Sequence, residues 1–164
     1  MNKPILLVED EENDVLFMRM VVERIGLKNP LSVARDGREA LDYLRGEGPY
    51  ADRQRYPLPG LMLLDLRLPY VPGLAILEWL RQQPAFAQLP VLVLSSSDQD
   101  ADVEAAYRLG ANAYLVKPPL VSDLERRVRL IKRYWLDTEG PPAGCAEWQA
   151  VIVARPSEKV KDQR

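Results

Sequence analysis

The segment LMLLDLRLPYVPG, Leu61 to Gly73, decides the fold class because an apolar run ends in one carboxylate and then leaves through a loop. Its first four residues are all apolar, which is typical of a strand covered on both faces. Asp65 follows at once, and Pro69 and Gly73 mark the loop after it. The segment therefore predicts a buried strand of a parallel sheet with an aspartate at its carboxyl end.

Four other apolar runs resemble this one, and segments of helical periodicity separate them. The five predicted strands are residues 4–8, 31–34, 61–64, 91–94 and 113–116. A last helix is expected to begin at a capping box, SDLE at 122–125, and to end near Leu136. This alternation predicts an α/β fold, a doubly wound five-stranded parallel sheet with helices on both faces.

Two stretches fall outside the alternation. Residues 46–60 are rich in proline and polar residues and are longer than an ordinary connection, so we expect an inserted surface loop. The tail from residue 138 begins as a linker and contains WQAVIVA at 148–154. This apolar segment is either one extra strand or a patch that needs a partner.

Composition excludes several classes of protein. The net charge of −2 argues against a dedicated nucleic-acid binder, and no apolar run reaches the roughly 18 residues of a membrane span. The single cysteine, Cys145, leaves no disulfide framework, so we expect a cytoplasmic protein. Because histidine is absent, any chemistry depends on carboxylates, hydroxyls, lysine and tyrosine.

Polar residues follow four of the predicted strands, and the carboxyl ends of parallel strands meet at one edge of a sheet. They are Glu9 and Asp10, Asp65, Ser95, and Lys117. Each alone is most often a turn or cap residue. Together the acids accumulate negative charge, which a lysine and a divalent cation would neutralise, and Mg²⁺ suits such oxygen ligands.

These residues occur in the order of four motifs of a known family. ILLVEDEEND, LLDLRLPYVPG, VLVLSSSD and AYLVKPP resemble the motifs of the response-regulator receiver domain of two-component signalling. The resemblance covers roughly residues 3–136, which implies a receiver domain at 1–137, a tail at 138–164 and no output domain. It also implies a flavodoxin-like sheet with strand order 2-1-3-4-5. The insertion at 46–60 further resembles regulators that accompany bacterial phytochrome-type kinases.

The resemblance also assigns roles to residues. Asp65 is the expected phosphoacceptor, taking a phosphoryl group from a phosphohistidine of a partner sensor kinase. Asp10, Asp65 and the backbone carbonyl of Arg67 are the implied ligands of Mg²⁺, and Glu9 acts mainly through water. Lys117 is expected to bind a phosphoryl oxygen.

Two further roles concern the response to phosphorylation. The Ser95 hydroxyl is expected to bind the phosphoryl group, and Tyr114 is the expected switch, which turns inward when Ser95 moves. The peptide bond between Lys117 and Pro118 is cis in many members of the family, and the sequence leaves open which form it takes here.

Other classes of protein compete with this one. An aspartate-dependent phosphatase of the haloacid-dehalogenase type needs a second aspartate where this chain has Arg67. A flavodoxin-like redox protein lacks support because an acidic run follows the first strand. A degenerate receiver that serves only as a docking module stays open. For output we expect protein contact rather than DNA, with a homodimer through Leu130, Tyr134 and the apolar residues 151–154.

Overall fold

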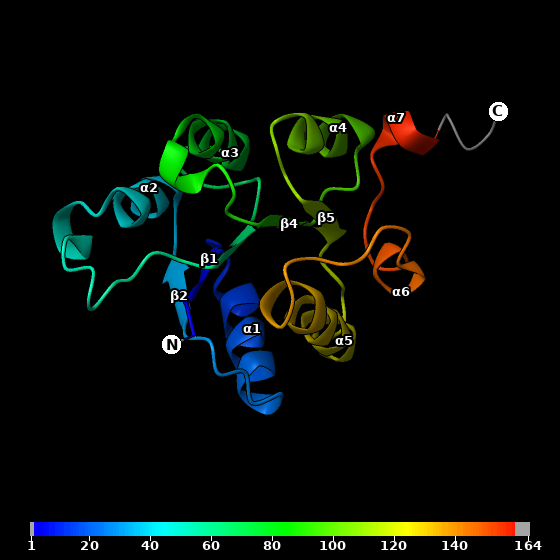
Figure 1. Cartoon of the computed structure of the whole chain (residues 1–164), viewed down its shortest axis with the longest axis horizontal. Helices are drawn as coiled ribbons and strands as arrows, with labels where there is room; N and C mark the ends of the chain where they lie inside the picture. Colours follow the sequence, from blue (N-terminus) through cyan, green and yellow to red (C-terminus); the bar gives the residue numbers. More distant parts are fainter. Residues whose placement is uncertain (1, 160–164) are drawn as a thin grey trace.

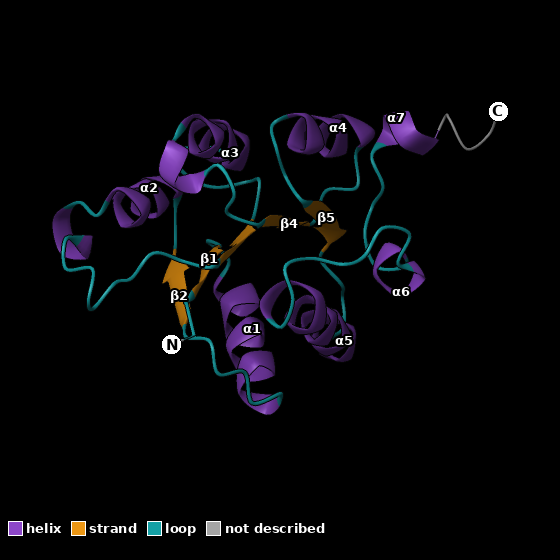
Figure 2. Cartoon of the chain, in the orientation of Figure 1, coloured by secondary structure: helices purple, strands orange, loops and turns teal. Residues whose placement is uncertain are grey.

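The computed structural model describes residues 2–159 and contains one five-stranded parallel sheet between two layers of helices (Figures 1 and 2). The strand order is β2-β1-β3-β4-β5, which confirms the predicted fold class and order. The strands are β1 (Ile5–Val8), β2 (Leu31–Ala34), β3 (Leu61–Leu64), β4 (Val91–Ser95) and β5 (Ala113–Val116).

The helices divide between the two faces of the sheet (Figure 1). One face carries α2 (Gly37–Arg45), α3 (Gly73–Gln82) and α4 (Asp100–Arg108), and the other carries α1 (Glu12–Arg24) and α5 (Val121–Ile131). Shorter helical turns are η1 (Gly48–Tyr50), η2 (Pro84–Phe86), η3 (Lys132–Leu136), α6 (Ala146–Gln149) and α7 (Pro156–Lys159). No helix in residues 2–159 has both the length and the apolar character that a membrane crossing requires.

The apolar strands divide their side chains between two cores. Leu6 and Val8 of β1 pack with the helices α2, α3 and α4, whereas Ile5 and Leu7 pack with α1 and α5. Successive side chains of a strand point to opposite faces, so a strand covered on both sides is apolar throughout. This physical requirement explains why the short apolar runs of the sequence identify the strands.

The last helix differs from its prediction at one end. It begins at Val121, and Leu120 precedes it without any side-chain cap, so the predicted capping box at 122–125 is wrong. The extended residue Leu120 starts the helix before Ser122, which therefore lies inside the first turn. At the other end one turn of π-helix, η3, continues the helix to Leu136, as predicted.

The inserted residues 46–60 close onto α2. The guanidinium of Arg53 donates hydrogen bonds of 2.7 Å to the backbone carbonyls of Tyr43 and Leu44, which lie at the end of that helix. The ring of Tyr50 packs against that of Tyr43, with the ring centroids 5.1 Å apart. A cation at the C-terminus of a helix satisfies carbonyls that lack partners inside the helix. The insertion is therefore a packed loop.

The tail folds back beside β5, as Figure 1 shows. Trp148 on α6 is 4% exposed and packs against Tyr134 and Trp135. The extra strand considered for residues 148–154 is wrong: this segment holds the end of α6, a turn and an irregular stretch with one backbone hydrogen bond to the sheet, from Val153. The apolar segment instead finds its partner within the chain.

Candidate functional site

Three carboxylates meet at the carboxyl edge of the sheet. Glu9 and Asp10 follow β1, Asp65 follows β3, and the pairing of Val8 with Leu64 brings the two strand ends side by side. One carboxylate oxygen from each of the three lies within 4.8 Å of the other two. The structure thus brings together the acidic residues that the sequence predicted.

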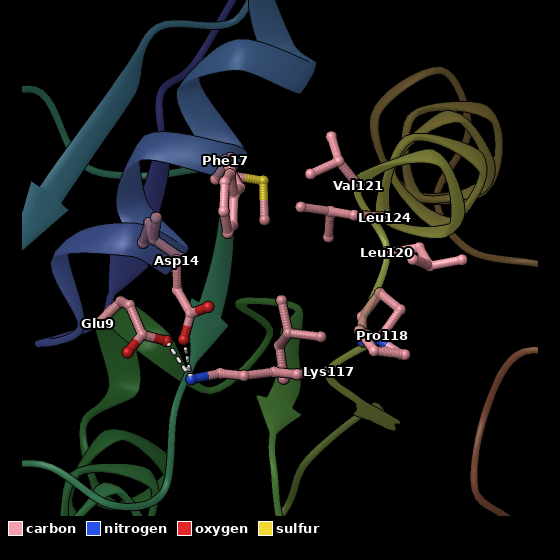
Figure 3. Close-up of a pocket in the computed structure, with 12 residues that line it drawn as sticks. Glu9, Asp14, Phe17, Lys117, Pro118, Leu120, Val121 and Leu124 are labelled. Carbon is pink, nitrogen blue, oxygen red and sulfur yellow. Dashed lines mark hydrogen bonds and ion pairs between the residues drawn. The ribbon is translucent and has the colours of Figure 1, made fainter.

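Lys117 reaches this group from the end of β5. Its Nζ lies 2.7 Å from Glu9 Oε2, 3.0 Å from Asp65 Oδ2 and 2.8 Å from Asp14 Oδ2 (Figure 3 draws the pairs with Glu9 and Asp14). Asp14 lies in the first turn of α1 and was missed by the sequence analysis. Its signal was the continuation of the acidic run from Glu9 into that helix.

Burial perturbs the protonation of this cluster. The side chains of Glu9 and Asp65 are only 3% and 5% exposed. Burial raises the pKa of Glu9 to about 7, aided by the charge of Asp65 and opposed by the hydrogen bond from Lys117. Burial disfavours the charge of Lys117, but the carboxylates of Asp14, Glu9 and Asp65 outweigh it and raise the pKa of the lysine. The ammonium therefore stays charged beside acids that compete for it.

The donor set fits a hard divalent cation. Three carboxylates converge with their oxygens close together, and the one ammonium among them cannot neutralise Glu9, Asp10 and Asp65 together. Uncompensated charge in a buried site is costly, and a cation with oxygen ligands removes that cost. These three side chains are the residues of the described chain that fit such an ion.

A buried hydroxyl and a buried tyrosine lie next to the acids in the sheet order. Ser95 ends β4, is fully buried and accepts a 3.2 Å hydrogen bond from the backbone N–H of Ser97. Tyr114 of β5 is also fully buried, and its hydroxyl donates to the backbone carbonyl of Ser97 at 2.8 Å. The side chain of Tyr114 thus occupies the inward position that the family resemblance associates with switching.

The sequence analysis missed Ser97, in the loop after β4, and Asp102, on α4. The Ser97 hydroxyl donates a 2.5 Å hydrogen bond to Asp102 on α4, and the side chain of Arg67 lies 3.4 Å from the same carboxylate. Arg67 also donates its backbone N–H to Asp65 Oδ1 at 3.3 Å. Arg67 therefore connects the loop of Asp65 with α4.

Gly73 holds the loop of Asp65 by close approach. A Cβ at this position would lie 2.3 Å from the backbone oxygen of Asp65, too close for any side chain. The backbone N–H of Gly73 donates to the carbonyl of Leu66 at 3.0 Å. The glycine that the motif places eight residues after Asp65 therefore has a steric cause.

The peptide bond between Lys117 and Pro118 is trans, because residues 2–159 contain no cis peptide bond. The cis form that many members of the family have is therefore not the form of this bond here. A trans bond is the ordinary preference before proline, by about 0.5–1 kcal/mol.

A cavity of about 190 Å³ adjoins the site between α1 and α5 (Figure 3). Glu9, Asp14 and Lys117 line its polar end, and Phe17 and Leu124 are among the apolar side chains that line the rest. The site therefore opens beside an apolar surface.

A doubly wound sheet with paired acids after β1, an aspartate after β3 and a lysine after β5 defines the receiver class of signalling domains. The family model of the response regulator receiver domain matches residues 5–129, and the chain belongs to that family.

Two regulatory proteins resemble the chain over most of its length. The probable methanogenesis regulatory protein FilR2 of Methanothrix harundinacea is 40% identical over 84% of this chain and 86% of its own length. The response regulator Rcp1 of Synechocystis sp. is 38% identical over 86% of this chain and 94% of its own length.

Solved structures agree with these sequence relatives. The Mn²⁺-bound form of Rcp1 superposes with a TM-score of 0.75, covering 86% of this chain and 99% of that one at 38% identity. The phosphorylated cyanobacterial phytochrome response regulator RcpA has a TM-score of 0.78 over 87% of this chain and 100% of its own, at 34% identity. The predicted likeness to regulators of phytochrome-type kinases is thereby confirmed.

Proposed function

We propose that this receiver accepts a phosphoryl group on Asp65 from a phosphohistidine of a partner sensor kinase of the phytochrome type. The observation that carries the proposal is the 3.0 Å pair between Lys117 Nζ and Asp65 Oδ2 within a cluster of three further acids. The solved structure of RcpA is that of a phosphorylated protein, which supports the same chemistry here.

The reaction needs a nucleophile and charge neutralisation. An Asp65 oxygen attacks the phosphorus, the new O–P bond forms, the P–N bond breaks, and the imidazole of the kinase leaves with the electron pair. Lys117, which lies beside Asp65, binds an oxygen of the transferred phosphoryl group through its ammonium. The buried Ser95 hydroxyl donates a hydrogen bond to another phosphoryl oxygen. Hydrolysis of the acyl phosphate later restores Asp65.

Mg²⁺ is the proposed cofactor. Asp10, Asp65 and the backbone carbonyl of Arg67 would hold it, with Glu9 acting through water, and the convergence of the carboxylates supports this set. When bound, the ion neutralises charge on the transferred phosphoryl group. The related response regulator Rcp1 has a solved Mn²⁺-bound form, which supports a divalent cation as the partner of this protein.

The surface beside the cavity is the proposed docking site for the kinase. Leu16, Phe17 and Met20 on α1 and Leu120 before α5 are 36% to 59% exposed, which is unusual for large apolar side chains. Phe17 and Leu120 line the cavity that ends at Lys117. A helix that carries the phosphohistidine can therefore rest on this surface and present the phosphorus to Asp65.

Incubation with phosphorylated phytochrome-type histidine kinases, in the presence of Mg²⁺, tests the proposal. Label is expected to move to the native protein and not to Asp65→Asn, and Phe17→Ser is expected to slow transfer from the kinase. Phe17→Ser should accept phosphoryl groups from a small-molecule donor at the native rate. A native protein that takes no label from any donor would instead be a docking module without phosphorylation.

Signalling then passes through protein contact. We also propose a cytoplasmic location, which the single cysteine supports. The homodimer through α5 and the tail stays a prediction; Tyr134 from its expected surface donates to Glu147 of α6 at 2.7 Å within the same chain.

A further inference from the structure

Three hydrogen bonds form a closed ring between the tail and the edge of the sheet. The backbone N–H of Val153 donates to the carbonyl of Tyr114 at 2.7 Å. The hydroxyl of Tyr107 on α4 donates to the carbonyl of Val153 at 2.6 Å and accepts from the N–H of Tyr114 at 3.2 Å. The Tyr107 hydroxyl thus accepts the hydrogen bond from the N–H of Tyr114 that a backbone carbonyl of a neighbouring strand would otherwise accept.

Contacts on both sides of this ring hold the tail. Val151 and Ile152 pack against the core on the side of α1 and α5, and Val153 packs against the core on the side of α4. Arg155 then pairs with Glu104 of α4, with Nε at 3.0 Å and Nη2 at 2.8 Å from Oε1. Residues 151–155 therefore cover the edge of the sheet and both layers beside it.

Tyr114 connects this segment with the phosphoacceptor edge. Its backbone bonds to Val153 and Tyr107, while its hydroxyl donates to the carbonyl of Ser97, whose N–H donates to Ser95. Moving the Tyr114 side chain outward would disturb the edge strand to which the tail is bonded.

An open edge strand invites pairing with another chain. β5 is the last strand of the sheet, so its outer N–H and C=O groups have no strand partner within the sheet. The tail satisfies the groups of Tyr114, directly and through Tyr107. Any extended segment of a second molecule must displace residues 151–155 before it can pair here.

We propose that residues 151–155 form an intramolecular strap that closes the β5 edge against a second strand and holds Tyr114 in its inward position. The proposal is independent of phosphorylation, because every contact it uses is present in the structure described.

Hydrogen exchange of the full-length protein tests the strap. Arg155→Glu places two carboxylates together at Glu104, and we expect about three- to tenfold faster exchange at Val153 and Tyr114. Exchange at Ser97 should rise in parallel. The double variant Glu104→Arg with Arg155→Glu restores an ion pair of reversed sign, so it should regain most of the protection.

Matched variants complete the test. Tyr107→Phe removes only the bridging hydroxyl and should also speed exchange at Val153 and Tyr114. Arg129→Glu breaks a comparable exposed pair with Glu125 and should leave both amides unchanged.

Three results would overturn the inference. Unchanged exchange at Val153 in both Arg155→Glu and Tyr107→Phe would show that no strap protects the edge. Protection at Val153 that grows with protein concentration, together with a dimeric mass in light scattering, would place the segment on a second copy. Faster exchange at Val153 with no change at Ser97 would show that the strap does not hold Tyr114.

Discussion

The ammonium of Lys117 lies 2.8 Å from a carboxylate oxygen of Asp14, so the lysine of the site is shared with helix α1. Asp65 is 3.0 Å from the same nitrogen. Asp14 therefore competes with Asp65, and with any phosphoryl group on it, for one positive charge.

Asp14→Asn is expected to free Lys117 and reduce the negative charge that an anionic donor meets. Phosphorylation of Asp65 by a small-molecule phosphodonor should become about two- to fivefold faster, as expected for roughly 0.5–1 kcal/mol in the barrier. The rate of incorporation of label measures this. Glu23→Gln, an exposed change near the other end of α1, is the control and should have no effect; a slower rate in Asp14→Asn would show that Asp14 positions the lysine productively.

Asp65→Asn should abolish phosphorylation yet stabilise the fold in the absence of divalent cations. Its carboxylate is buried beside Glu9, and removing the charge relieves repulsion, for a gain of about 1 kcal/mol in the free energy of unfolding. Urea denaturation compares the variant with Asp98→Asn, an exposed acid in the loop after β4. A less stable Asp65→Asn would mean that its pair with Lys117 outweighs the repulsion.

The raised pKa of Glu9 predicts a dependence of stability on pH. The unfolded chain loses this proton near pH 4.5, whereas the folded protein keeps it to about pH 7. Between these values the folded state binds more protons, so the free energy of unfolding falls as the pH rises, by up to about 3 kcal/mol.

Glu9→Gln removes this contribution and should flatten the stability profile between pH 5 and 7. Denaturation at a series of pH values, without divalent cations, measures the slope. An identical slope in native protein and variant would assign the dependence to other groups.

Gly73→Ala should destabilise the protein by about 1–3 kcal/mol, because the new methyl group meets the backbone of Asp65. The same clash displaces the loop of Asp65, so Mg²⁺ affinity, measured by titration calorimetry, should fall as well. Gly26→Ala has no neighbour within 4 Å but a φ of 66°, so it should cost about 1 kcal/mol with unchanged Mg²⁺ affinity. Equal losses of affinity in the two variants would contradict a specific contact at Gly73.

The sequence by itself determined the sheet and the meeting of its strand-end residues. Strands covered on both faces must be apolar throughout, and parallel strands place their carboxyl ends on one edge. The sequence alone therefore predicts that Glu9, Asp65 and Lys117 lie close together, although they are far apart in the chain.

Only the tertiary structure decided the contacts that depend on how helices and tail pack around that sheet. The pair of Asp14 with Lys117 spans 103 residues and depends on the rotation of α1 against β5. The docking of residues 151–155 depends on the Tyr107 hydroxyl, which bridges the carbonyl of Val153 and the N–H of Tyr114 at the edge of β5. The hydrophobic pattern of the sequence predicts which faces of strands and helices are buried. It does not predict which distant residue a polar group binds, or where an apolar tail packs.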